Sequence, residues 1–130
     1  MPSIKTHPFN THAEARVALA LEVIGSRLGK VGLSTKEIAV EVRLSESRLR
    51  QLMKKELQLS ACQCIRECRL LRAKELLESS LLSVKEIIAI VGIRDASHFS
   101  RDYKRRFGVG PREYRRGRRK ADTETYLVLE

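Results

Sequence analysis

Apolar residues recur at the three- and four-residue spacing of a helix in two long stretches of the chain. The first stretch runs from 13 to 28 and is expected to close at Gly29 or Gly32, because glycine commonly follows a helix end. Its apolar positions are Val17, Leu21, Ile24 and Leu28. The second stretch runs from 60 to 79 and predicts one long helix. Its apolar side carries Ile65, Cys68, Leu71, Leu76 and Leu77.

An internal repeat accompanies these stretches. The segment STKEI beginning at Ser34 reappears as SVKEI beginning at Ser83, which is 49 residues further on. In each copy a glutamate follows the serine by three positions, as in a capping box, where both side chains accept hydrogen bonds from unpaired amides at a helix start. Each copy therefore predicts a short helix, which ends at Val42 in the first copy and at Val91 in the second.

A turn and a second helix follow in each copy, at about 45–57 and 95–107, with Ser45 and Asp95 as the capping residues. The apolar residues of these helices recur every four positions and predict a buried face, whereas the residues between them are strongly basic and face outward. The matched apolar positions are Leu49, Met53 and Leu57 in the first copy and Phe99, Tyr103 and Phe107 in the second. Two short helices with a basic outer face on the second indicate a helix-turn-helix unit.

The predicted fold is all-α, with two helix-turn-helix subdomains at 13–58 and 81–117 joined by a long central linker helix at 60–79. Residues 1–12 are expected to form a flexible arm and residues 118–130 a charged tail. The absence of Trp, with only three Pro and seven Gly, favours helices over a turn-rich β architecture. A helix of about twenty residues spans roughly 30 Å, close to the roughly 34 Å of one turn of B-DNA, so it suits two recognition helices in successive major grooves.

The charge of the chain indicates a polyanionic partner. The formal net charge is +10, and the stretch from Arg94 to Lys120 holds eleven basic and three acidic residues. Such an excess favours nucleic acid, although charge alone does not separate DNA from RNA, anionic lipid or an acidic protein. No apolar run approaches the roughly 20 residues of a membrane span, and the N-terminus lacks a signal-peptide pattern. Three cysteines do not make a disulfide framework, so we expect a cytoplasmic protein without a membrane partner.

The second copy closely resembles the signature of the AraC/XylS family of bacterial transcription regulators. The residues that carry the resemblance are Ile87, Val91, Gly92, Ile93, Asp95, Ser97, His98, Phe99, Ser100, Arg101, Tyr103, Lys104, Phe107, Gly108, Pro111 and Tyr114, with Arg69, Ala73, Leu76 and Leu77 in the linker. The resemblance implies about seven helices and a regulator that binds beside a promoter, activates transcription and contacts RNA polymerase. The chain departs from the family pattern at Arg43 (usually a turn Gly), Ser60-Ala61 (usually Ser-Pro), Ile88 (usually Ala) and Ile90 (usually polar).

Base reading requires side chains near the N-terminal half of each recognition helix. The candidates are Ser47, Arg48, Arg50 and Gln51 in the first helix and Ala96, Ser97, His98 and Arg101 in the second. Arginine can donate two hydrogen bonds to guanine, and glutamine can pair in the same way with adenine. The alternative for Arg50 and Arg101 is a phosphate contact or a solvated charge, and His98 is equally suited to packing beside the backbone.

Phosphate contacts are expected further along the same helices and at the starts of the shorter ones, where amides and the helix dipole attract anions. The candidates are Lys54, Lys55, Lys104 and Arg105, together with Thr35, Lys36 and Lys85. The run Arg115, Arg116, Arg118, Arg119 and Lys120 is either a source of non-specific attraction or a solubilising tail.

Three cysteines are the only competing chemical signal. Cys64 and Cys68 are four residues apart on one helix, and with Cys62 they could hold a soft metal ion. Cys64 aligns with Tyr114 across the repeat and Cys68 falls in the apolar stripe, which favours structural packing without metal or cofactor. No nucleotide-binding loop, metalloprotease motif or paired catalytic carboxylates occur, so we expect no enzymatic activity.

The sequence therefore predicts a transcription regulator that reads specific double-stranded DNA, interpreted as a promoter activator. Monomeric binding is favoured over an obligate dimer, and the bacterial nucleoid is the expected location. Two alternatives remain open, a metal- or thiol-responsive DNA-binding switch and a non-specific architectural nucleic-acid binder.

Overall fold

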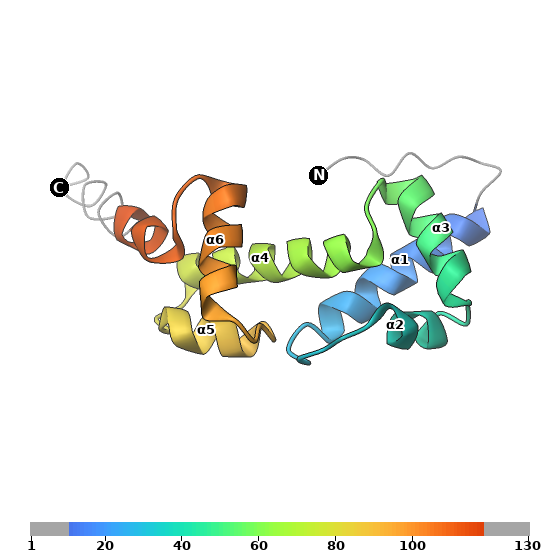
Figure 1. Ribbon diagram of the computed structural model, residues 1–130, viewed down its shortest axis with the longest axis horizontal. Coiled ribbons are helices and arrows are strands. Elements are labelled where there is room, and N and C mark those ends of the chain that lie inside the picture. The colour runs from blue at the N-terminus through green and yellow to red at the C-terminus, as the bar shows by residue number, and fades with distance from the viewer. Residues whose placement is uncertain (1–10, 119–130) are drawn as a thin grey trace. The chain divides into compact units, whose positions relative to one another are not determined.

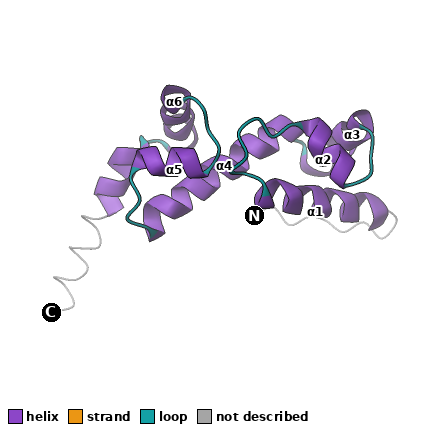
Figure 2. Ribbon diagram, turned by 90° about the horizontal axis from the view of Figure 1, so that it is seen from below, coloured by secondary structure: helices purple, strands orange, loops and turns teal. Residues whose placement is uncertain are grey.

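The computed structural model describes residues 11–118, which form helices joined by turns (Figures 1 and 2). Within that range no strand occurs, so the all-α prediction is confirmed. The helices are α1 (Thr11–Ser26), α2 (Thr35–Glu41), α3 (Glu46–Leu57), α4 (Ala61–Ser79), α5 (Val84–Ile90) and α6 (Ala96–Phe107). A further helix covers 111–118. The expected arm and tail lie outside the described residues, except that residues 11 and 12 belong to α1 and residue 118 to the last helix.

The described residues divide into two compact units, a first unit that ends at residue 68 and a second unit that begins at residue 69, and each has its own apolar core. The boundary between them falls inside α4, so this helix belongs to both units. Its first half places Ala61, Cys64 and Ile65 in the core of the first unit. Its second half contributes Leu70, Ala73, Leu76 and Leu77 to the core of the second unit.

The expected single apolar stripe on α4 is therefore wrong at Leu71, whose surface is 46 % exposed. The second half of the helix buries Leu70 and Ala73 instead, because it packs against a core different from the one that its first half serves. A periodic pattern read along the whole helix cannot reveal that the buried side changes between its two halves.

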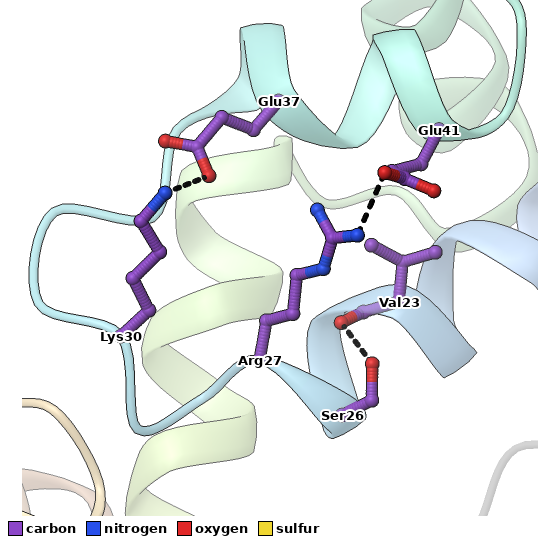
Figure 3. A network of polar contacts seen from close by, with 6 residues as sticks. All are labelled: Val23, Ser26, Arg27, Lys30, Glu37 and Glu41. Carbon is purple, nitrogen blue, oxygen red and sulfur yellow. Dashed lines mark hydrogen bonds and ion pairs between the residues drawn. The ribbon is translucent and has the colours of Figure 1, made fainter.

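In the first unit, α1 packs against α2 and α3. Three of its four predicted apolar positions, Val17, Ile24 and Leu28, are buried, and Leu21 is half-buried. The helix ends at Ser26, before both of the predicted closing positions, Gly29 and Gly32. Ion pairs then join the segment after α1 to α2, with Arg27 Nη2 lying 2.7 Å from Glu41 Oε1 and Lys30 Nζ lying 2.7 Å from Glu37 Oε2 (Figure 3). These pairs are exposed, so their contribution to stability is small.

The predicted capping box is complete in the second copy of the repeat and half-formed in the first. Ser83 Oγ accepts from the Glu86 amide and Glu86 Oε1 accepts from the Ser83 amide. Ser34 likewise accepts from the Glu37 amide. The Glu37 carboxylate, however, binds Lys30 (Figure 3), an ion pair outside the repeat that draws this side chain away from the helix start.

The predicted caps of the two recognition helices are both confirmed. Ser45 Oγ accepts from the Arg48 amide at the start of α3. At the start of α6, Asp95 Oδ1 accepts from the amides of Ser97 and His98, at 2.9 and 3.1 Å. Figures 1 and 2 show α6 running crosswise to α5, against which it packs in the core of this unit.

The two units differ at the turns that flank their recognition helices. Arg43 and Gln58 adopt positive φ angles of 58° and 59° in the first unit. The matching positions of the second unit, Gly92 and Gly108, have φ angles of 77° and 88°. Only glycine adopts this left-handed conformation without steric cost, so the departure noted at Arg43 stores about 1 kcal/mol of backbone strain.

Replacing Arg43 by glycine is therefore expected to raise the unfolding free energy of the first unit by about 0.5–1 kcal/mol. Two measurements check this change in unfolding free energy: chemical denaturation of the chain, and amide hydrogen exchange of α2 and α3 under native conditions. The matched control is Arg43→Ala, which removes the same charged side chain and keeps the strain, so it should leave the stability unchanged. Equal stabilisation by both variants would show that the side chain, and not the backbone, is responsible.

Aromatic rings fill the core of the second unit. The ring of Tyr103 lies 5.8 Å from that of Phe99, 4.6 Å from that of Phe107 and 6.1 Å from that of Tyr114. Burial raises the pKa of the Tyr103 phenol well above its usual range. The Tyr114 hydroxyl donates to Glu78, which ties the helix at 111–118 to α4.

Arg115 has a structural role that the sequence did not reveal. The expectation that it belongs to a solvated basic run is wrong, because its surface is only 9 % exposed. Its guanidinium donates to the backbone carbonyls of Leu76, Leu77, Ser80 and Leu82 at the C-terminal end of α4 and the turn after it. Carbonyls at a helix end lack partners within the helix. Arg115 supplies donors at this end of α4, in addition to the Ser80 amide and hydroxyl, which bond the Leu76 carbonyl. Arg116 and Arg118 of the same run are exposed, and Arg119 and Lys120 lie outside the described residues.

Candidate nucleic-acid interface

The outward face of α3 carries all four side chains that the sequence proposed for base reading in the first copy. Ser47, Arg48, Arg50 and Gln51 are exposed. The opposite face is held by buried residues, which are Leu49, Leu52 and Met53. Because that packing fixes the rotation of α3, the four polar side chains point together into solvent. Arg50 Nη2 also lies 3.6 Å from Glu46 Oε1, one helical turn earlier.

The outward face of α6 is arranged in the same way. Ala96, Ser97, His98 and Arg101 are exposed, while Phe99 and Tyr103 anchor the other side of the helix. The pKa of the Asp95 carboxyl is lowered, mainly by the hydrogen bond that it accepts from the His98 amide and also by the one from the Ser97 amide. Asp95 therefore stays ionised as the cap of α6, and the charge of Arg101 favours the same state.

Basic side chains continue each exposed face toward the C-terminal end of its helix. Lys54 and Lys55 on α3, and Lys104 and Arg105 on α6, are all exposed. Arg105 Nη1 lies 3.9 Å from Asp102 Oδ1, an exposed contact with little energetic weight. Each unit thus presents a stripe that changes from mixed polar groups at the helix start to cations near its end.

The residues proposed as phosphate contacts at the starts of the two short helices differ in their exposure. Lys36 on α2 and Lys85 on α5 are exposed and accessible to a phosphate. Thr35 is only 7 % exposed, so its side chain is a poor candidate for a phosphate contact. The sequence could not distinguish Thr35 from Lys36, because both lie in the first turn and only the packing of α2 decides which one faces inward.

Two polar residues of the second unit that lie beside this face were not among the predicted DNA contacts. Ser100 on α6 and Arg112 in the last helix line an open hollow together with Lys85 and Lys104. Ser100 follows Ser97 by three positions, a spacing that places both on one side of a helix. Arg112 follows Pro111, and proline at a first helical position is a start signal. Both signals were present in the sequence.

The three cysteines do not form a metal site in the described part of the chain, where no group of three candidate ligands converges. Cys62 is exposed, Cys64 is buried and Cys68 lies between the two in exposure. Burial raises the pKa of the Cys64 thiol to about 11 and also raises that of Cys68. Because the thiolate is the form that binds metals and reacts with oxidants, these two thiols suit core packing better than sensing.

Comparison with known proteins agrees with this geometry. A model of the helix-turn-helix domain family matches residues 38–117. The HTH-type transcriptional regulator GbdR of Pseudomonas aeruginosa is 36 % identical over 81 residues, which are 62 % of this chain and 22 % of that protein.

Two solved structures share the fold. An AraC-type transcriptional regulator from Chromobacterium violaceum matches with a TM-score of 0.77 and 30 % identity, over 84 % of this chain and 96 % of that one. The DNA-binding domain of AdpA, solved in complex with a target DNA, matches with a TM-score of 0.70 and 24 % identity, over 84 % of this chain and 94 % of that one.

Two capped helices with exposed basic faces, each on its own core, define a helix-turn-helix DNA-binding protein. The chain belongs to the AraC family of bacterial transcriptional regulators and carries the DNA-binding domain of that family. This is a family of DNA-binding regulators and not of enzymes. The chain spans about a fifth of the length of GbdR. None of the helices in residues 11–118 combines the length and apolar character needed to cross a bilayer.

Proposed function

We propose that this chain reads a specific duplex site by inserting α3 and α6 into successive segments of the major groove, and that it activates transcription from a promoter beside that site. The observation that carries the proposal is the repeated geometry of the two helices. Each is capped at its start, anchored by buried residues on one face, and exposed on the other with polar and basic side chains. Rigid presentation of such a face is what base reading requires.

Within this proposal, Arg50 and Gln51 read bases for α3, and His98 and Arg101 do so for α6. Ser47, Arg48, Ala96 and Ser97 lie beside them on the same exposed faces. Arg50 must release Glu46 in order to reach a guanine, since the two side chains lie 3.6 Å apart in the free protein. Arg101 is therefore the stronger candidate for a bidentate contact.

The remaining cations fix the duplex through its phosphates. Lys54, Lys55, Lys104 and Arg105 follow the reading residues on each helix, and Lys36 and Lys85 lie at the starts of the helices before them. Such contacts position the protein and supply affinity, but carry little sequence information.

The partners and location follow from this role. We propose RNA polymerase as the protein partner, monomeric binding to DNA, and action at the nucleoid in the bacterial cytoplasm. No cofactor is required, because the base and phosphate contacts come from side chains and backbone amides of the chain itself. Two different recognition helices in one chain read an asymmetric site without a second copy.

Selection of binding sites from random duplexes tests the proposal. The expected result is a site with two short motifs about one helical turn apart, bound about 10³-fold or more tightly than random DNA. Equal competition by random duplex or by A-form RNA would instead assign the chain to non-specific nucleic-acid binding.

Replacing Arg101 by alanine is expected to weaken binding to the selected site by about 1–3 kcal/mol and to relax the preference at one base pair. Binding assays on duplexes substituted at each position measure both effects. The matched control is Arg105→Ala on the same helix, which should weaken binding to all duplexes alike. A uniform loss in Arg101→Ala as well would reassign Arg101 to the phosphate backbone.

A further inference from the structure

The second unit contains an open hollow of about 650 Å³ beside its recognition helix. Its walls come from three elements, which are α5, α6 and the segment 110–113 at the start of the last helix. The contribution of α6 includes Ser97, Ser100 and Lys104, which follow one side of the helix at spacings of three and four residues. The hollow therefore adjoins the face of α6 that carries Arg101.

The lining of this hollow suits an oxyanion. Lys85, Lys104 and Arg112 bring three positive charges from three different elements, against the single carboxylate of Glu113. The hydroxyls of Ser97 and Ser100 add donors to the same lining. Cations that converge from separate elements, together with a hydroxyl, are the groups that proteins use to hold phosphate.

The rest of the lining is apolar. Val84 and Ile88 of α5 and Pro111 of the last helix contribute hydrocarbon surface beside the cations. A bare inorganic anion gains nothing from such a surface, whereas a deoxyribose ring can pack against it while its phosphate meets the charged groups. Ile88, where the family usually has alanine, thus forms part of an apolar wall.

We propose that this hollow holds the sugar-phosphate backbone of the duplex beside the base pairs read by α6. Arg112 and Lys104 donate to one phosphate, Ser100 adds a hydroxyl donor, and Val84 and Pro111 pack against the adjoining sugar. The inference rests on the proposed function, since it assigns a further contact to the same bound duplex. It adds Arg112 and Ser100 to the interface and gives the last helix a part in DNA binding.

The test measures the affinity for the selected duplex across a series of salt concentrations, in the full chain and in Arg112→Gln. Each phosphate contact contributes about 0.9 to the slope of log K against log salt. Arg112→Gln is therefore expected to lower that slope by about 1 and to weaken binding roughly fivefold at low salt, equally on all duplexes. Glu113→Gln should act in the opposite direction and strengthen binding a few-fold.

Arg118→Gln is the matched control, because it removes the same charge from the same helix outside the hollow. Arg118 is exposed, and its charge acts on Tyr114. Its loss should leave the salt slope nearly unchanged. At equal ionic strength, DNA affinity in inorganic phosphate should equal DNA affinity in chloride. If phosphate weakens DNA binding in the parent chain but not in Arg112→Gln, the hollow binds a free phosphate ion and the proposal is overturned.

The outcomes separate this inference from the proposed function. Specific binding with the same salt slope and affinity in Arg112→Gln and Arg118→Gln would overturn the backbone contact alone. Binding with no preference for a selected duplex would overturn the proposed sequence-specific function, and the inference with it. Far-ultraviolet circular dichroism of each variant confirms that the helices are intact, as expected for exposed positions.

Discussion

Replacing Arg115 by alanine is expected to destabilise the second unit by about 3 kcal/mol. The guanidinium is 9 % exposed and donates to the carbonyls of Leu76, Leu77, Ser80 and Leu82. Alanine removes this donor from the carbonyls of Leu77, Ser80 and Leu82, whereas the Leu76 carbonyl keeps its bonds from the Ser80 amide and hydroxyl. Each buried unsatisfied group costs about 1–3 kcal/mol where water cannot replace the donor. Because water can partly replace the lost donor, the total cost of the unsatisfied carbonyls should come to about 3 kcal/mol.

Amide hydrogen exchange of the second unit, together with urea denaturation, measures this loss. Amides of α5 and α6 should exchange faster in Arg115→Ala, whereas those of α2 and α3 should change less. Arg116→Ala is the matched control, because Arg116 is exposed in the same helix, and its stability should stay within about 0.5 kcal/mol of the parent. Arg115→Lys keeps the charge but loses the planar fork and should fall between the two. If Arg115→Ala behaves like Arg116→Ala, the capping role is wrong.

Replacing Leu49 by alanine is expected to destabilise the first unit by about 2–5 kcal/mol. Leu49 has no exposed surface and packs in the core beneath α3. Its loss removes transfer energy and leaves a cavity, so α3 loses the packing that holds its outward face in place. The motif read by the first unit should lose most of its contribution to DNA affinity.

Hydrogen exchange and binding to duplexes that carry one motif at a time measure the two consequences of Leu49→Ala. Leu49→Met is the volume-conserving control and should cost less than about 1.5 kcal/mol. Val40→Ala, at an exposed position of α2, should be nearly neutral. Retention of full affinity by a variant whose α3 amides have lost protection would show that α3 does not read DNA.

The features that the sequence predicted correctly are those set by neighbouring residues. The caps at Ser45 and Asp95 depend on an oxygen two or three positions before an unpaired amide. The buried faces of α3 and α6 depend on apolar residues at helical spacing. Both rules act within one helix, so the orientation of the candidate reading residues could be inferred without knowledge of the fold.

The errors have a common physical origin in contacts that reach beyond a single helix. Arg115 was taken for part of a basic run because nothing near it in the sequence shows the carbonyls about 35 residues earlier. Glu37 was expected to close a capping box but binds Lys30 instead. Leu71 was misjudged because the packing of α4, and not its periodicity alone, decides which side of the helix is covered.

The sharing of α4 between two cores has a consequence for how such chains can be recombined. Its halves, Ala61–Cys68 and Arg69–Ser79, are each shorter than the roughly 12–15 residues at which an isolated helix begins to hold in water. A fragment that starts or stops at the unit boundary would keep the core residues of its own half of α4, but on a helix too short to hold by itself and with a broken end. Chimaeras that exchange DNA specificity should therefore replace the recognition helix within an intact chain. A junction inside α4 would divide a helix that both units need.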